Sequence, residues 1–177
     1  MLYFFIIYHI IGFIFTFIIG SLLHFTYKFF DQNIIIGYFS PVNESTWEHL
    51  KLLITPVIIF SLFEYFMYGK DLDNFIIVKA LSILLGMFTI VASFYTYTGI
   101  LGNNYLLLDI ATFILGVFVT YYFSYRMLQT NFLYKENSNY IGIFIIFLIV
   151  FFMMYFTINP PKINLFLDPI TNTYGIN

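Results

Sequence analysis

The chain has 177 residues, of which 61% are hydrophobic and only 9% are charged, whereas an average soluble domain is about 25% charged. Seven Lys and Arg side chains against nine Asp and Glu form no basic patch, which excludes a nucleic-acid-binding protein. The apolar content excludes a disordered chain. The absence of cysteine excludes a disulfide scaffold, a thiolate metal site and a cysteine nucleophile. The composition therefore indicates an integral membrane protein.

Five apolar stretches are long enough to cross a bilayer, since a spanning helix needs about 20 mostly apolar residues. They cover residues 3–25, 45–68, 74–97, 105–127 and 140–158. The sequence predicts an all-α, polytopic membrane helix bundle of about five transmembrane helices. We expect a single membrane domain over 1–177 with a surface tail over 159–177.

Two local features modify this simple pattern. The segment after the first span contains an apolar run, Ile34 to Phe39, which predicts an interfacial or re-entrant loop. Pro56 lies inside the second span, where it is expected to kink the helix and to leave the carbonyl of Leu52 without its helical partner.

The distribution of basic residues gives a prediction of orientation. The side that carries the N-terminus collects four basic residues, and the other side collects three; they are Lys70, Lys79, Arg126 and Lys135 against Lys28, Lys51 and Lys162. The positive-inside rule then favours a cytoplasmic N-terminus and an external C-terminus in a cell membrane.

Ionisable side chains within a membrane are costly and usually pair or line a cavity, so their placement is informative. The predicted topology brings five of them to one end of the bundle: His24, Glu44, Glu48, His49 and Asp109. Histidine nitrogens and carboxylate oxygens are ligands of zinc and manganese. We therefore predict a polar site there that binds a divalent metal such as zinc, or alternatively a proton relay. The spacing matches no known metal motif.

Structural interpretations compete with a metal role at these positions. Ser45 and Glu48 have the spacing of a capping box, in which the Glu48 carboxylate reaches back to the Ser45 N–H, and this is the favoured interpretation for Glu48. The two histidines can equally be interfacial and satisfied by water. Asp109 follows three leucines and precedes an uncharged run, so it is expected to face the interior and to bond to His24 or His49.

A second pair of charged residues lies toward the opposite end. Glu64 is near the end of the second predicted span and Lys79 is near the start of the third. Antiparallel neighbours would place them at similar depth, so we predict a structural ion pair between Glu64 and Lys79, which is favoured over a role in transport.

Three segments carry a resemblance to a known family. Residues 40–51 (Ser-Pro-Val-Asn-Glu-Ser-Thr-Trp-Glu-His-Leu-Lys), Phe94 to Gly99, and the tail from Pro160 to Gly175 resemble an uncharacterised family of small multi-pass membrane proteins from Firmicutes, especially clostridia. The resemblance implies a bacterial cytoplasmic-membrane protein. It implies no activity, because none is assigned to that family.

Three functions are compatible with these observations. The first is a small transporter or channel-like protein that moves an ion or small solute past the His/carboxylate cluster. The second is a membrane-embedded metal-dependent hydrolase, and the third is a non-catalytic partner subunit or assembly factor with membrane protein partners. The sequence leaves open whether the protein is an enzyme, and it predicts a lipid environment and no nucleic-acid partner. Transport is ranked slightly above the other two.

Overall fold

The computed structural model describes residues 2–176, with side chains described from Phe5 onward. Its long helices are α1 (Leu2–Phe29), α4 (Lys51–Met67), α5 (Phe75–Leu101), α6 (Leu106–Leu128) and α7 (Ser138–Ile158). Short helices fill the connections: α2 (Ile34–Gly37), α3 (Thr46–His49), η1 (Gly69–Asp71) and η2 (Asn164–Phe166). Across the residues that the structure describes, five segments are long and apolar enough to cross a membrane, with α3 and α4 counted as one. The predicted all-α bundle is confirmed.

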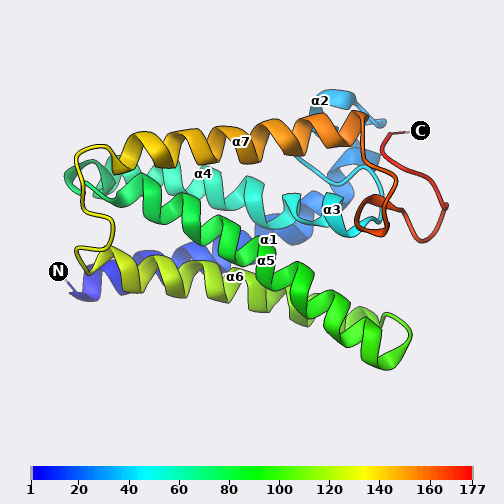
Figure 1. The fold of residues 1–177 in the computed structure, drawn as a ribbon, viewed down its shortest axis with the longest axis horizontal. Coiled ribbons are helices and arrows are strands. Elements are labelled where there is room, and N and C mark those ends of the chain that lie inside the picture. The colour runs from blue at the N-terminus through cyan, green and yellow to red at the C-terminus, as the bar shows by residue number, and fades with distance from the viewer. Residues whose placement is uncertain (1, 177) are drawn as a thin grey trace.

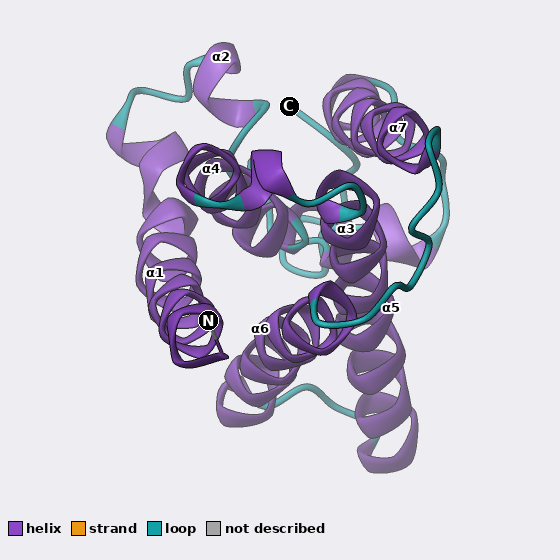
Figure 2. Cartoon of the chain, turned by 90° about the vertical axis from the view of Figure 1, so that its left-hand side faces the viewer, coloured by secondary structure: helices purple, strands orange, loops and turns teal. Residues whose placement is uncertain are grey.

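The long helices lie side by side, and the two chain termini lie at opposite ends of the bundle (Figure 1). Viewed from the N-terminal end, α1, α4 and α7 form one side and α5 and α6 the other (Figure 2). Helix α5 packs against both α6 and α7, and α1 packs against α4 and α6. Large apolar side chains such as Leu22, Phe88 and Phe144 are exposed on the outside, as expected for helices that contact lipid.

The apolar core lies where α4 and α5 meet the other helices. Leu53 and Val57 of α4, Ile83 of α5 and Val117 of α6 are almost completely buried in it. Helices α4 and α5 are also the two most buried of the five spans. Helix α1 packs against α4, and α6 packs against α5, so these two buried helices position the ends of α1 and α6.

The observed helices differ from the predicted spans at particular residues. Helix α5 continues to Leu101, beyond the predicted end at Tyr97, and the Thr98 hydroxyl donates to the Phe94 carbonyl within the helix. Gly102, with a φ of 75°, then ends the helix in the left-handed conformation that favours glycine. The second span is two helices, with Leu50 between α3 and α4.

The apolar loop after α1 contains the one-turn helix α2, whose Ile34 and Ile35 are exposed. Pro56 lies inside α4, and the carbonyl of Leu52 that it leaves free lies against Gly20 of α1. The C-terminal tail folds back onto the bundle: the Ile176 N–H donates to Thr157 O, and Asn43 Nδ2 donates to Gly175 O. The predicted surface tail therefore covers the end of the bundle that carries the histidines; its last residue lies outside the described range.

Candidate metal site at the end of the bundle

Three of the predicted site residues meet at one point. His24 Nε2 and His49 Nε2 lie 3.2 Å apart, and Glu44 Oε2 lies 3.4 Å from each of these two nitrogen atoms. The residues come from the end of α1, from the loop before α3, and from the last position of α3. Each side chain is about one-third exposed, so the group is partly shielded yet open on one side.

Local hydrogen bonds fix the position of Glu44. Asn43 Oδ1 accepts from the Ser45 N–H at 2.9 Å, which turns the chain just before α3. Ser45 is the N-cap of α3, and its hydroxyl accepts from the Glu48 N–H at 3.3 Å. Asn43 is itself held by the tail through Gly175. The loop that carries Glu44 is therefore held at both ends.

The orientation of His49 identifies which ring nitrogen is free to bind a ligand. His49 Nδ1 lies 2.9 Å from the Ser45 carbonyl oxygen. A carbonyl only accepts, so Nδ1 must carry a proton and donate it, and in the neutral ring Nε2 then has a lone pair. A hydrogen bond of this kind to the backbone is the usual support of a metal-binding histidine. Nε2 is the atom that faces His24 and Glu44.

The electrostatics of the group favour a cation. Hydrogen bonds with His24 and then His49 hold the pKa of Glu44 well below its usual range, and each of these bonds requires a proton on the Nε2 atom of the histidine. An ionised carboxylate oxygen beside a nitrogen lone pair is repulsive unless a proton or a metal ion lies between them. Of the described residues, these three form the group of histidines and carboxylates close enough to share one metal ion.

The group lines a pocket of about 410 Å³ between α1, α3, α5, α6 and the tail. Its lining residues include members of the α5–α6 turn and of the tail, and these two segments diverge at the same end of the bundle (Figure 1). Its remaining wall is largely apolar, with a few polar side chains that include Asn104, Asp109 and Thr112.

Asp109 lines the same pocket but does not join the three-residue group. Its partner is Tyr97, whose hydroxyl donates to Asp109 Oδ1, and Asn104 Nδ2 donates to Oδ2 at 3.4 Å. The expected bond to His24 or His49 is therefore replaced by one to α5. Asp109 is near enough to His49 to interact with it electrostatically.

Glu48 points away from the group, as adjacent helical positions about 100° apart require. Its Oε2 lies 2.5 Å from Lys51 Nζ, and it also accepts from the Val42 N–H at 3.1 Å. Ser45 N donates to Asn43 instead. The capping-box expectation is thus half wrong: Ser45 caps Glu48, but the Glu48 carboxylate is drawn to the buried ammonium of Lys51.

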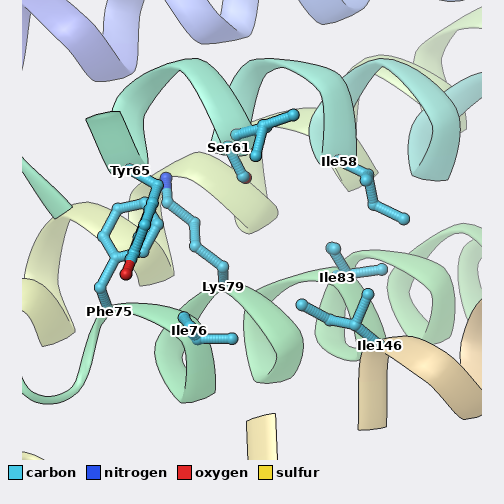
Figure 3. A pocket seen from close by; sticks show the side chains of 9 residues that line it. Ile58, Ser61, Tyr65, Phe75, Ile76, Lys79, Ile83 and Ile146 are labelled. Carbon is cyan, nitrogen blue, oxygen red and sulfur yellow. The ribbon is translucent and has the colours of Figure 1, made fainter. Parts of the chain in front are cut away.

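The Glu64 and Lys79 side chains form an ion pair toward the other end, with 2.5 Å between Oε2 and Nζ and at most 2% exposure of either side chain. The Tyr68 hydroxyl donates to Glu64 as well. Lys79 also lines a second cavity of about 390 Å³ between α4, α5 and α7, whose wall is mainly isoleucine and aromatic side chains (Figure 3).

Sequence reasoning missed the contribution of the tail to the histidine-lined pocket. Asn164, Leu167, Pro169 and Ile170 all line it. The Asp168 carboxylate holds this part of the tail by accepting from the Ile170 N–H and the Thr171 hydroxyl, both at 2.8 Å. The Asp-Pro-Ile-Thr sequence was a signal for a turn, but nothing local indicated what the turn would cover.

The fold and the site define an all-helical bundle of membrane type with a histidine–glutamate–histidine group at one end. The sequence profile described as a family of unknown function (DUF6512) matches residues 5–176, so the chain belongs to this family. No curated protein and no solved structure gave a significant match.

Proposed function

We propose that this protein binds zinc through His24, Glu44 and His49 and acts as a membrane-embedded, metal-dependent hydrolase. The observation that carries the proposal is the triangle formed by the three ligand atoms, with edges of 3.2, 3.4 and 3.4 Å. Zinc binds nitrogen and oxygen at about 2.0–2.2 Å, so two ligand atoms of a tetrahedral site lie about 3.4 Å apart. The triangle thus has the size of one face of a zinc tetrahedron.

Hydrolysis is supported by the fourth coordination position that the three ligands would leave open on the metal. Two histidines and one glutamate are a ligand set of catalytic zinc sites, in which a water molecule occupies the fourth position. All three side chains line the pocket, so a fourth ligand can enter from there. Zinc lowers the pKa of bound water to about 7, which supplies a nucleophile at neutral pH. Asp109 provides a carboxylate in the same pocket to accept the proton.

Metal analysis of the purified protein tests the first part of the proposal. The chain should be purified in detergent without a polyhistidine tag and its zinc measured by elemental analysis. We expect one zinc per chain, lost in His24→Ala, His49→Ala and Glu44→Gln. Glu136→Gln is the matched control, because Glu136 is an exposed residue of the α6–α7 loop. A protein without stoichiometric metal, or with metal that the three variants leave unchanged, would contradict the proposal.

A second candidate function, transport of an ion or small solute, is favoured by polar side chains buried along the bundle. Lys79 Nζ lies 5.6 Å from the ring centre of Tyr121, whose hydroxyl lies 2.8 Å from Thr16 Oγ1. Thr16 is two turns before His24 on α1, about 12 Å along the helix. Tyr121 and Thr16 therefore lie between the Glu64–Lys79 pair and the histidine group. Uptake of protons or zinc by reconstituted vesicles, abolished in His24→Ala, would support transport over hydrolysis.

Membrane location and orientation belong to this proposal too. Exposed apolar side chains on the helices support a lipid environment. We propose a cell membrane with the N-terminus on the cytoplasmic side, on the basis of the basic residues in the connections and near the helix ends. In that orientation the histidine group lies at the external face.

A further inference from the structure

We infer that the substrate is a neutral lipid ester, with its acyl chain along the apolar wall of the histidine-lined pocket and its carbonyl at the metal. This inference rests on the proposed metal-dependent hydrolysis. It adds the chemical class of the substrate, and three observations support it.

The first observation is the separation of polar and apolar surface within the pocket. The polar groups His24, Glu44 and His49 meet at one point of the wall. Apolar side chains from three other segments line the same space: Phe94 of α5, Leu106 and Phe113 of α6, and Leu167 and Ile170 of the tail. A ligand that satisfies both surfaces has one polar group and a long apolar portion.

The second observation is the charge of the lining. Among the described residues that line the pocket, none is a lysine or an arginine, and two, Glu44 and Asp109, are acidic. A doubly charged metal ion would be balanced by these two carboxylates, which leaves no excess positive charge. Sites that bind phosphate groups usually supply arginine or lysine, and the first turn of α6, which lines this pocket, already carries the Asp109 carboxylate. The lining therefore favours an uncharged ester and disfavours a phosphodiester.

The third observation is the exposure of the apolar wall. Leu106 and Ile170, which line the pocket, are each more than 70% exposed. Leu106 is the first residue of α6 and Ile170 belongs to the tail, and both segments lie at the same end of the bundle (Figure 1). In a bilayer these side chains face lipid or the interface. An amphiphile can therefore enter the pocket from the membrane while its ester group reaches the histidines.

The reaction is an ordinary hydrolysis and needs no further reactant. The zinc that His24, Glu44 and His49 would hold would supply an activated water, whose oxygen would form a bond to the carbonyl carbon while the bond from that carbon to the ester oxygen breaks. The water proton passes to the Asp109 carboxylate and then to the oxygen of the leaving alcohol. The products are a fatty acid and an alcohol.

The test compares substrates and one pair of tail variants. The purified full-length protein, with its metal content measured, is assayed on dioleoylglycerol in mixed micelles, on p-nitrophenyl acetate and on bis(p-nitrophenyl) phosphate. We expect cleavage of the two esters and none of the phosphodiester. Ile170→Glu should raise KM for dioleoylglycerol about tenfold, which is the scale of one lost apolar side-chain contact, and should leave the metal content unchanged.

Ile163→Glu is the matched control, because Ile163 is an exposed isoleucine of the same tail that does not line the pocket. Equal effects of the two variants on KM for dioleoylglycerol would overturn the inferred acyl-chain position. Metal-bound protein that cleaves the phosphodiester and not the esters would overturn the substrate class while leaving the proposed function intact. Protein that binds no metal overturns both.

Discussion

The carboxylate of Glu48 and the ammonium of Lys51 form an ion pair that is almost completely excluded from solvent, with side chains 2% and 1% exposed. Lys51 Nζ also donates to Gly37 O at 2.7 Å and to Thr157 Oγ1 at 2.6 Å. One lysine thereby joins the loop after α1, the start of α4 and the end of α7. This network lies beside the candidate metal site and shares Glu48 with the cap of α3.

Removal of one charge from this pair should be strongly destabilising. Glu48→Gln or Lys51→Met leaves the other charge buried without a counter-ion, which typically costs about 3–5 kcal/mol. We expect a large fall in the melting temperature in detergent. The double variant Glu48→Gln/Lys51→Met should recover part of the loss. A double variant whose loss equals the sum of the two single losses would show that the pair is not coupled.

Asp109 should be needed for hydrolysis but not for metal retention. Asp109→Asn keeps the shape of the side chain and its contact with Tyr97 but removes the proton acceptor. We expect unchanged zinc content and a loss of kcat of about 10²–10⁴-fold, the usual contribution of a positioned base. The conservative control is Tyr97→Phe, which should have a smaller effect. Loss of zinc from Asp109→Asn would assign Asp109 to the ligands instead.

The packing of α7 against α5 should depend on Gly142. A Cβ atom at this position would lie 2.5 Å from Ile77 N and 2.7 Å from Ile76 C, both backbone atoms that cannot rotate away. Gly142→Ala should therefore lower the melting temperature by several degrees. Gly99→Ala is the control, because a Cβ there has no neighbour within 4 Å, and alanine favours helix. Equal behaviour of the two variants would contradict the observed helix packing.

The orientation can be tested directly because the chain contains no cysteine. Lys135→Cys in the α6–α7 loop and Lys162→Cys in the tail each introduce one exposed thiol. We expect an impermeant maleimide added to intact cells to label the second and not the first. The opposite pattern would reverse the proposed orientation, and labelling of both would contradict an odd number of spans.

Asp168 should hold the tail against the pocket. Asp168→Ala removes the acceptor for the Ile170 N–H and the Thr171 hydroxyl. We expect faster proteolytic cleavage within residues 163–176 while the bundle stays folded, because loss of such a turn frees only local backbone. Asp71→Ala, in the η1 turn at the opposite end, is the control. An unchanged cleavage pattern would show that the tail is held without Asp168.

The sequence predicts the helices well because a membrane-spanning helix depends on the composition of one continuous segment. Length and composition alone define a spanning segment, and the structure ends each long helix within about five residues of its predicted limits. The capping of Glu48 by Ser45 was also visible in the local pattern. The continuation of α5 to Leu101 was not, since threonine and glycine, at positions 98 and 99, are weak helix formers and the helix nevertheless accommodates both.

The site was predicted only in part, because its details depend on residues distant in the chain. Topology alone placed His24, Glu44, Glu48, His49 and Asp109 at one end of the bundle. Topology did not show which of these residues would join the three-residue group. Glu48 is bonded by Lys51 and also by Thr157, which is more than 100 residues away from it in the chain. Asp109 is bonded by Tyr97. The part of the wall made by Leu167 and Ile170 depends on how the tail folds back.

The three proposed ligands come from α1, from the following loop and from α3. The loop alone does not fix the distance between the end of α1 and α3. A metal ion bound to all three would therefore act as a clasp between the first membrane helix and the second. Removal of the ion should loosen the end of α1 and the loop that carries Glu44 before it affects the remainder of the bundle. Hydrolysis at the site and the attachment of these two helices to each other would then depend on the same ion.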